Sequence, residues 1–143
     1  MPISECCQRN IATLPLQSTA FDAAKLMEEK NVDMVVVTED ARPVGVVTDR
    51  DLVVRVLTKY RDPESTPVAD IMSEDPLVLD EGTGLYEAMQ FGRDWNLRRL
   101  PIVDAEGRLV GIITLDDIIR LLVEEISWVA HIIEKVSSPQ ASA

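Results

Sequence analysis

The sequence predicts a mixed α/β (α+β) fold in which two β-α-β-β-α repeats pack as a pseudo-twofold pair and continue into an extended C-terminal helix. Three observations predict it. An internal repeat fills most of the 143 residues, hydrophobic residues make up 46% of the chain with only 4% aromatic, and helix and strand patterns alternate twice in the same order. An aliphatic core rich in β-branched residues suits buried strands that are covered by helices.

The repeat is visible when residues 35–52 are set against residues 101–118. The matched pairs, each 66 positions apart, are Gly45 with Gly111, Thr48 with Thr114, and Asp51 with Asp117. Upstream the offset falls to 65, as between Asn31 and Asn96. We expect the one extra residue of the second copy near Arg98 or Arg99. A register kept over this length indicates two copies of one structural unit.

Each repeat is predicted to contain a short extended segment, a helix, a β-hairpin and a second helix. Apolar residues at helical spacing predict the first helix, with Thr19 and Thr83 as candidate N-caps. Two apolar runs joined by a turn-forming segment predict the hairpin. The first copy places these elements at residues 12–14, 19–30, 34–38, 44–48 and 49–59. The second copy places them at residues 77–79, 83–94, 100–104, 109–114 and from 116 onward.

The domain organisation follows from the repeat. We expect the first repeat at residues 1–60, a linker at 61–67 with two prolines, and the second repeat at 68–125. Residues 126–143 are expected to form a C-terminal helix extension and a disordered tail. Each half is too small to bury much surface alone, so the two sheets should pack on each other.

Composition excludes several classes of function. The formal net charge is −11, which disfavours nucleic acid as the main partner because an acidic surface repels the phosphate backbone. The two cysteines, Cys6 and Cys7, are adjacent, and the single histidine, His131, is distant, so no metal site is expected. No signal peptide or membrane span is evident, and we expect a cytoplasmic protein with reduced, apolar cysteines.

The two copies of Gly-h-h-Thr-x-x-Asp, where h is apolar, resemble tandem CBS domains. The stretches VGVVTDRDL and LPIVDAEGRLVGIITLDDI, and the segment DIMSEDP at residues 70–76, are similar to that family's usual sequence. The resemblance covers about residues 3–123. The first copy departs from it at residues 5–9, where ECCQR stands in place of a segment of the D-x-M kind.

The resemblance implies a Bateman module, a pair of CBS repeats with two related clefts. Such clefts bind adenosine ligands: AMP, ADP, ATP, S-adenosylmethionine or NAD-type dinucleotides. Members of the family regulate an enzyme, channel or transporter, and they are not enzymes themselves. The implied function here is a non-catalytic regulatory module, with an adenosine nucleotide or S-adenosylmethionine as its ligand.

The repeated Thr-x-x-Asp motif admits two interpretations. A carboxylate accepts hydrogen bonds only, so Asp51 and Asp117 suit the hydroxyl donors of a ribose, while Thr48 and Thr114 can donate or accept. The same pattern is a capping box, in which Thr is the N-cap and the acid is the third helical residue. The two roles can coexist.

The repeats differ in residues suited to phosphate. Arg98 and Arg99 precede a strand of the second copy and resemble the basic pair found there in the γ subunit of AMP-activated protein kinase. Guanidinium groups bind phosphate in bidentate fashion. The first copy has Asp33 at the corresponding place, while Arg50 can supply charge to one cleft. We expect unequal clefts. Alternatively, these arginines are solvated surface residues.

Apolar residues on the strands and on the segments before them are candidates for contact with adenine, although such residues are more often ordinary core. They are Thr13, Pro43, Val44, Val78, Pro101 and Val110, with Ile11, Leu77 and Leu109 beside them.

The C-terminal segment carries more apolar surface than a sixty-residue repeat needs, which marks an interface. Its apolar residues are Ile118, Ile119, Leu122, Val123, Ile126, Val129, Ile132, Ile133 and Val136. We expect a homodimer or a contact with a client enzyme or transporter. The alternative function is a dimerisation or interaction module with no nucleotide ligand. No catalytic motif is present, and neighbouring acids such as Asp116 and Asp117 are more simply helix-dipole partners than metal ligands.

Overall fold

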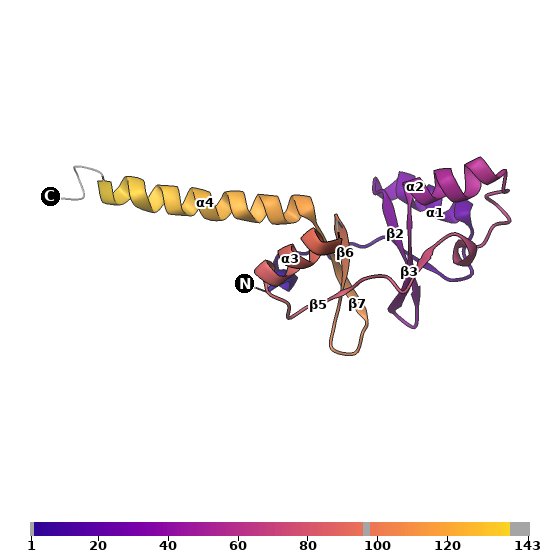
Figure 1. Ribbon diagram of the computed structural model, residues 1–143, viewed down its shortest axis with the longest axis horizontal. Coiled ribbons are helices and arrows are strands. Elements are labelled where there is room, and N and C mark those ends of the chain that lie inside the picture. The colour runs from indigo at the N-terminus through magenta and orange to yellow at the C-terminus, as the bar shows by residue number, and fades with distance from the viewer. Residues whose placement is uncertain (1, 96–97, 138–143) are drawn as a thin grey trace.

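The computed structural model describes residues 2–95 and 98–137. Two sheets lie next to each other, each with helices on its outer side, and one long helix extends away from the second sheet (Figure 1). This is the mixed architecture, with a pseudo-twofold pair of repeats and a C-terminal helix, that the sequence predicts. The expected disordered tail comprises residues 137–143, but Ser137 is the last residue of the C-terminal helix. Residues 138–143 lie outside the described residues.

The first sheet has four strands in the order β1-β2-β3-β4. Strand β1 pairs in parallel with β2, and the pairs β2–β3 and β3–β4 are antiparallel. The elements are β1 (Thr13–Pro15), α1 (Ala20–Lys30), β2 (Met34–Glu39), β3 (Arg42–Thr48) and, from the second repeat, β4 (Ser73–Glu74). Helix α1 begins with a capping box at Thr19 and ends at Asn31, whose φ of 52° is left-handed.

The second sheet has three strands in the order β5-β6-β7, with β5 parallel to β6 and β6 antiparallel to β7. Its elements are β5 (Leu79–Asp80), α3 (Leu85–Trp95), β6 (Arg99–Val103), β7 (Leu109–Thr114) and α4 (Leu115–Ser137). Gln8 bridges to Ile112 beside β7, in the position that β4 takes beside β3. The two sheets are therefore built alike.

The extra residue of the second repeat lies in the hairpin turn, so its expected position near Arg98 or Arg99 is wrong. Val37 lies opposite Gly45 and Ile102 opposite Gly111, which keeps the offset of 65 through β2 and β6. The offset becomes 66 between the strands of each hairpin, where residues 39–42 correspond to residues 104–108. A surface turn tolerates an insertion that a buried strand register does not.

The longer turn is held by Asp104. Its Oδ1 accepts hydrogen bonds from the backbone N–H groups of Glu106 and Arg108, both at 2.9 Å, and Arg108 Nε donates to Oδ2 at 2.9 Å. These interactions, led by the bond from the Arg108 backbone, hold the pKa of Asp104 below its usual value. Gly107 has a φ of 81°, a left-handed conformation that glycine adopts without strain.

The second helix of the first repeat is less regular than the sequence predicts. Residues 49–59 form three short pieces: α2 (Asp49–Asp51), the π-helix η2 (Leu52–Val56) and the 3₁₀ turn η3 (Leu57–Lys59). Three β-branched valines crowd η2, and the Thr58 hydroxyl donates to the Val54 carbonyl at 2.6 Å. Both features loosen a regular α-helical ladder. The corresponding segment of the second repeat is the uninterrupted α4.

The N-terminal segment of each repeat packs on the other repeat. We call residues 2–8, which include η1 (Ile3–Glu5), arm 1, and residues 67–74, which include η4 (Val68–Asp70), arm 2. Ile3 of arm 1 is fully buried in the core of the second sheet. Val68 and Ile71 of arm 2 are fully buried in the core of the first sheet. The packing units therefore differ from the sequence copies, because the arms are exchanged.

The two sheets cover each other on the faces that turn away from the helices. Val35 and Val37 belong to the core under α1, so the alternation of a strand turns Val36 to the opposite face. Val36 and its equivalent Pro101 are both buried. The hairpin turns also touch, since the Leu109 N–H donates to the Ala41 carbonyl at 2.8 Å. The expected packing of sheet on sheet is therefore present.

Each arm crosses a strand at a glycine. A Cβ on Gly45 would collide with the Met72 side chain of arm 2, and a Cβ on Gly111 would lie 2.6 Å from Cys7 Sγ of arm 1. These equivalent glycines let the arm backbone approach the strand closely. Close approach, rather than a left-handed turn, explains why both repeats have glycine here.

We predict that Gly111→Ala lowers the free energy of unfolding by about 1–3 kcal/mol, the usual cost of overpacking. The measurement is urea unfolding of the variant beside the native chain. In a Cys7→Ala background the clashing sulfur is gone, so the same substitution should cost less. Equal costs in the two backgrounds would show that the Cys7 sulfur is not the atom that excludes a Cβ at residue 111.

Candidate functional site

Two clefts lie between the repeats, one on each side of the pseudo-twofold axis. We name them the Thr48 cleft, of about 620 Å³, and the Thr114 cleft, of about 460 Å³. Both volumes fall in the range of small-molecule sites. Each cleft combines the Thr-x-x-Asp motif of one repeat with the chain that leads into the first strand of the other.

The two clefts have equivalent linings. The Thr48 cleft is lined by Met34, Val46, Thr48, Asp49, Arg50, Asp51, Ser73, Glu74, Asp75, Pro76, Leu77, Arg98, Arg99 and Pro101. The Thr114 cleft is lined by Gln8, Asn10, Ile11, Ala12, Asn31, Val32, Asp33, Met34, Arg99, Ile112, Thr114, Asp116, Asp117 and Arg120. Met34 and Arg99, which hold equivalent positions in β2 and β6, line both.

Both Thr-x-x-Asp motifs form capping boxes. The Asp51 backbone N–H donates to Thr48 Oγ1 at 3.2 Å, and the Thr48 N–H donates to Asp51 Oδ2 at 2.8 Å. The reciprocal bonds between Asp117 and Thr114 measure 3.1 and 2.9 Å. The capping interpretation is therefore confirmed in both repeats. It leaves acceptor capacity on each carboxylate, because an ionised carboxylate has about four lone-pair sites.

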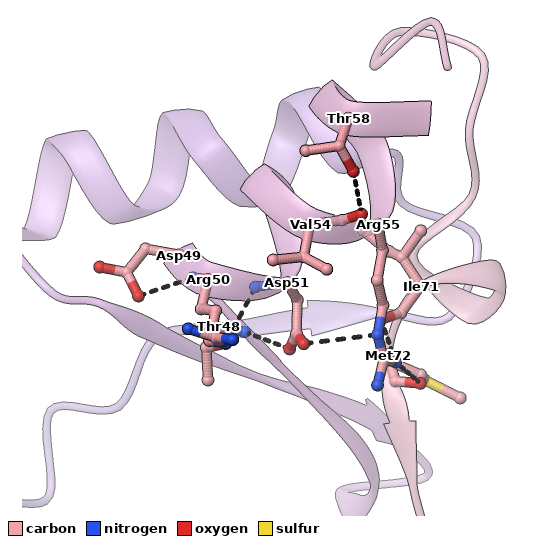
Figure 2. A network of polar contacts seen from close by, with 9 residues as sticks. All are labelled: Thr48, Asp49, Arg50, Asp51, Val54, Arg55, Thr58, Ile71 and Met72. Atoms are coloured by element: carbon pink, nitrogen blue, oxygen red, sulfur yellow. Dashed lines mark hydrogen bonds and ion pairs between the residues drawn. The ribbon is translucent and has the colours of Figure 1, made fainter. Parts of the chain in front are cut away.

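Asp51 is further held by Arg55, one turn along the chain (Figure 2). Arg55 Nε lies 3.6 Å from Asp51 Oδ1, and its Nη1 donates to the carbonyls of Ile71 at 2.9 Å and Met72 at 3.3 Å. One guanidinium thus joins the capping acid of the first repeat to arm 2. The contact therefore links Asp51, which lines the Thr48 cleft, to the residues of arm 2 just before Ser73, which also lines it.

Asp117 has a different second partner. Gln8 Nε2 of arm 1 lies 3.1 Å from Asp117 Oδ1 and 3.3 Å from Oδ2. Asp117 is only 7% exposed. The two equivalent acids therefore differ in setting: Asp51 is paired with a cation, whereas Asp117 is more deeply buried and receives a neutral amide.

The arginines are divided unequally between the clefts. Arg99 Nη2 lies 2.7 Å from Asp33 Oδ2, so the arginine that lines both clefts forms an ion pair with the other repeat. Arg50 and Arg98 line the Thr48 cleft, and Arg120 lines the Thr114 cleft. Among the described residues, these three guanidinium groups have no recorded partner. The clefts are therefore unequal, as expected: the Thr48 cleft has two of these unpaired arginines, and the Thr114 cleft has one.

The model of the CBS domain family matches residues 3–58 and 68–124, which cover most of the chain as two tandem copies. The protein belongs to the CBS domain family. A curated relative, the uncharacterised protein MK0525 of Methanopyrus kandleri, is 35% identical over 120 residues. That match covers 83% of this chain and 61% of the relative, so the chain spans about three-fifths of that protein's length.

Solved CBS structures share the fold. The CBS domain protein PAE2072 of Pyrobaculum aerophilum, complexed with AMP, has a TM-score of 0.74 and 27% identity, with 82% of this chain and 89% of that chain covered. The hexameric CBS-CP12 protein from bloom-forming cyanobacteria has a TM-score of 0.71 and 28% identity, with 83% and 69% covered. Structural neighbours of this CBS pair thus include a nucleotide complex and an oligomer.

Several residues named from the sequence do not line either cleft. Thr13 is an exposed residue of β1, paired with Val36, and Val78 precedes β5 without reaching the lining. Pro43 lies at the far end of β3. Val44 and Val110 fall where each hairpin shifts register, and both pack against the helix-side cores instead. A bulge redirects the side chain that it inserts, which sequence alternation does not reveal.

Other lining residues were missed. Val46 and Ile112 occupy equivalent positions two residues beyond the bulged valines, and their 66-residue offset was a usable signal. Gln8 and Ser73 enter because the arms are exchanged, which no local pattern indicates. Of the remaining candidates, Thr48, Asp51, Arg50, Arg98, Arg99, Pro101 and Leu77 line the Thr48 cleft. Thr114, Asp117, Arg99 and Ile11 line the Thr114 cleft.

The cysteines serve the packing of arm 1. Both are free thiols that pack against the core of the second sheet. Burial, followed by the negative charges of Cys7 and Asp117, raises the pKa of the Cys6 thiol. In the part of the chain that the structure describes, no three His, Cys, Asp or Glu side chains are placed to hold a metal ion. Within the same residues, no helix has the length and apolar content to cross a membrane.

We predict that Arg55→Ala lowers the free energy of unfolding by about 1–2 kcal/mol, because it strips two arm 2 carbonyls and Asp51 of a charged partner. Chemical denaturation measures the effect. Arg50→Ala, five residues earlier, is the matched control and should change stability by no more than about 0.5 kcal/mol. Equal effects of the two substitutions would show that the Arg55 contacts add nothing to the fold.

Proposed function

We propose that this CBS pair is a non-enzymatic regulatory module of the cytoplasm, which binds an adenosine nucleotide in the Thr48 cleft. Its signal would pass to a partner protein, an enzyme or a transporter, and the module would act as a homodimer. The observation that carries the proposal is the juxtaposition of a half-buried acid, two available arginines and apolar side chains in one cleft. The AMP complex of a CBS protein with the same fold supports the choice of ligand.

Asp51 is the proposed ribose acceptor. Its carboxylate is 15% exposed at the cleft and is already oriented by Thr48 and Arg55. A carboxylate held in this way loses little freedom when it accepts two hydroxyl donors, which favours binding. Asp117 is the equivalent residue of the second site, but its oxygens already receive the Gln8 amide.

Arg50 and Arg98 are the proposed phosphate ligands. They come from α2 and from the segment before β6, on opposite repeats, and both line the Thr48 cleft. A phosphate between them would gain charge-assisted hydrogen bonds. The acids Glu74 and Asp75 lie at the same cleft and favour a ligand of limited negative charge. AMP fits this balance better than ATP.

The apolar part of the lining is the proposed adenine site. Val46 and Leu77 are half-buried, and Pro101 is buried. An adenine ring against such side chains removes apolar surface from water, at about 25 cal/mol per Å². S-adenosylmethionine shares the adenosine part but carries a sulfonium cation near the position of the phosphate, so it should bind more weakly beside two arginines.

We predict that AMP raises the melting temperature of the chain in a thermal shift titration, and that ADP, ATP, NADH and S-adenosylmethionine raise it less. A ligand at a hundredfold excess over its Kd stabilises the fold by about 2.7 kcal/mol. Guanosine monophosphate is the control for a non-specific effect of phosphate. If no adenosine compound shifts the transition, the chain is an interaction module with an empty cleft.

We further predict that Arg98→Ala weakens AMP binding about tenfold in isothermal titration calorimetry, while the affinity for adenosine, which lacks the phosphate, is unchanged. A tenfold change corresponds to about 1.4 kcal/mol, within the range for one charge-assisted bond. Arg120→Ala is the matched control in the Thr114 cleft. The reverse result, loss with Arg120→Ala alone, would assign AMP to the Thr114 cleft.

A further inference from the structure

The outer part of α4 is a helix with no covering surface in the chain. Its first two turns are anchored, because Ile118 is buried in the core of the second sheet and Leu122 packs against it. From Val123 to Ser137 every residue is exposed, and the helix points away from both sheets (Figure 1). A helical segment of this length is marginal in water without a partner.

A stripe of apolar residues on α4 follows a heptad repeat, and all of its members except the half-buried Leu122 are exposed. Successive spacings of four and three residues connect Leu115, Ile119, Leu122, Ile126, Val129, Ile133 and Val136. The face opposite this stripe carries Arg120, Glu124, His131 and Lys135, together with the apolar Leu121 and Trp128. A helix that packs on a globular core usually has an apolar stripe with a period of 3.6 residues. A strict period of 3.5 residues is typical of two helices wound around each other.

We propose that α4 pairs in parallel with α4 of a second copy of this chain through the heptad stripe. The inference rests on the homodimer part of the proposed function and names its interface. In a heptad repeat labelled a to g, the apolar positions that face the partner helix are a and d. Isoleucine occupies all three a positions, Ile119, Ile126 and Ile133. The d positions are Leu115, Leu122, Val129 and Val136. β-Branched residues at a, with leucine at d, favour two parallel strands. Leucine occupies the first two of the four d positions, and valine occupies the other two.

The residues that flank the stripe agree with the parallel orientation. Beyond Leu122 the flanking positions are Val123, Glu125, Ala130 and Ile132. In a parallel pair, Glu125 lies beside Ala130 of the partner copy, so no like charges meet.

The apolar surface is sufficient for a stable pair. The exposed fractions of the stripe residues outside the core contact run from 47% at Leu115 to 75% at Val136. With the flanking Val123 and Ile132, pairing would bury on the order of 1,000 Å² in total, at roughly 60–120 Å² for each aliphatic side chain. That is close to the lower bound for specific interfaces, about 1,000 Å².

The test compares two double variants of the full chain by light scattering coupled to size-exclusion chromatography. Ile126→Lys with Ile133→Lys puts two cations into the stripe. Trp128→Lys with His131→Lys adds two lysines to the opposite face of the same helix turns, as the matched control. We expect the native chain and the control at twice the chain mass of 15.9 kDa, and the stripe variant at 15.9 kDa. Its self-association should weaken about 100-fold or more.

The outcomes separate the interface from the rest of the proposed function. A native dimer that persists in the stripe variant keeps the homodimer and overturns the α4 interface. A monomeric native chain overturns both. AMP binding by the stripe variant, measured by thermal shift, should equal that of the native chain, because Ile126 and Ile133 line neither cleft. A single cooperative thermal transition without ligand shows that the variant remains folded, and its midpoint should fall because the stabilising association is lost.

The orientation is tested by Val136→Cys near the end of the described helix. In a parallel pair the two introduced thiols lie opposite each other, so mild oxidation should give a disulfide-linked dimer on a non-reducing gel. The native chain, which contains only Cys6 and Cys7, is the control for other links. A dimer by mass that does not cross-link through residue 136 overturns the parallel orientation.

Discussion

The exchange of the arms is the constraint on which the rest of this structure depends. Ile3 is fully buried in the core of the second sheet, and Ile71 is fully buried in the core of the first. Neither core is complete without a segment of the other repeat. The exchanged arms therefore fix the position of one repeat relative to the other, and with it the positions of the walls of the clefts between them. Preorganised walls lower the entropic cost of binding a small ligand.

The capping acids connect this framework to the clefts. Asp51 and Asp117 fix the beginnings of helices that follow β3 and β7, and each also contacts the arm of the other repeat through one side chain. The contact is made by Arg55 in the first repeat and by Gln8 in the second. The two acids hold equivalent positions but have different partners, so the two clefts have equivalent linings and different charges. Capping and ligand contact are compatible, because the cap uses only part of the carboxylate.

The repeats diverge most in their last helix. In the first repeat a run of valines and a hydroxyl that competes for a carbonyl break the helix into short pieces, which end at Tyr60 with a left-handed φ of 56°. In the second repeat the helix continues without interruption for 23 residues. The chain after the last helix of the first repeat leads into arm 2, which packs on the first sheet. The last helix of the second repeat extends beyond the sheets and presents a surface for association.

The sequence by itself determined the repeat, the element order, the CBS resemblance and the Thr-x-x-Asp capping boxes, because these depend on local spacing and on a register kept along the chain. It named Thr48, Asp51, Arg98 and Pro101 as candidate ligand contacts, and the tertiary structure brought them to one cleft. Only the tertiary structure decided that Val46 faces the cleft while Val44 does not, because a bulge reverses the alternation there. Only the tertiary structure brought Gln8 to Asp117, 109 positions away. Contacts made by exchanged segments depend on the burial of Ile3 and Ile71, and no local pattern encodes the partner that buries them.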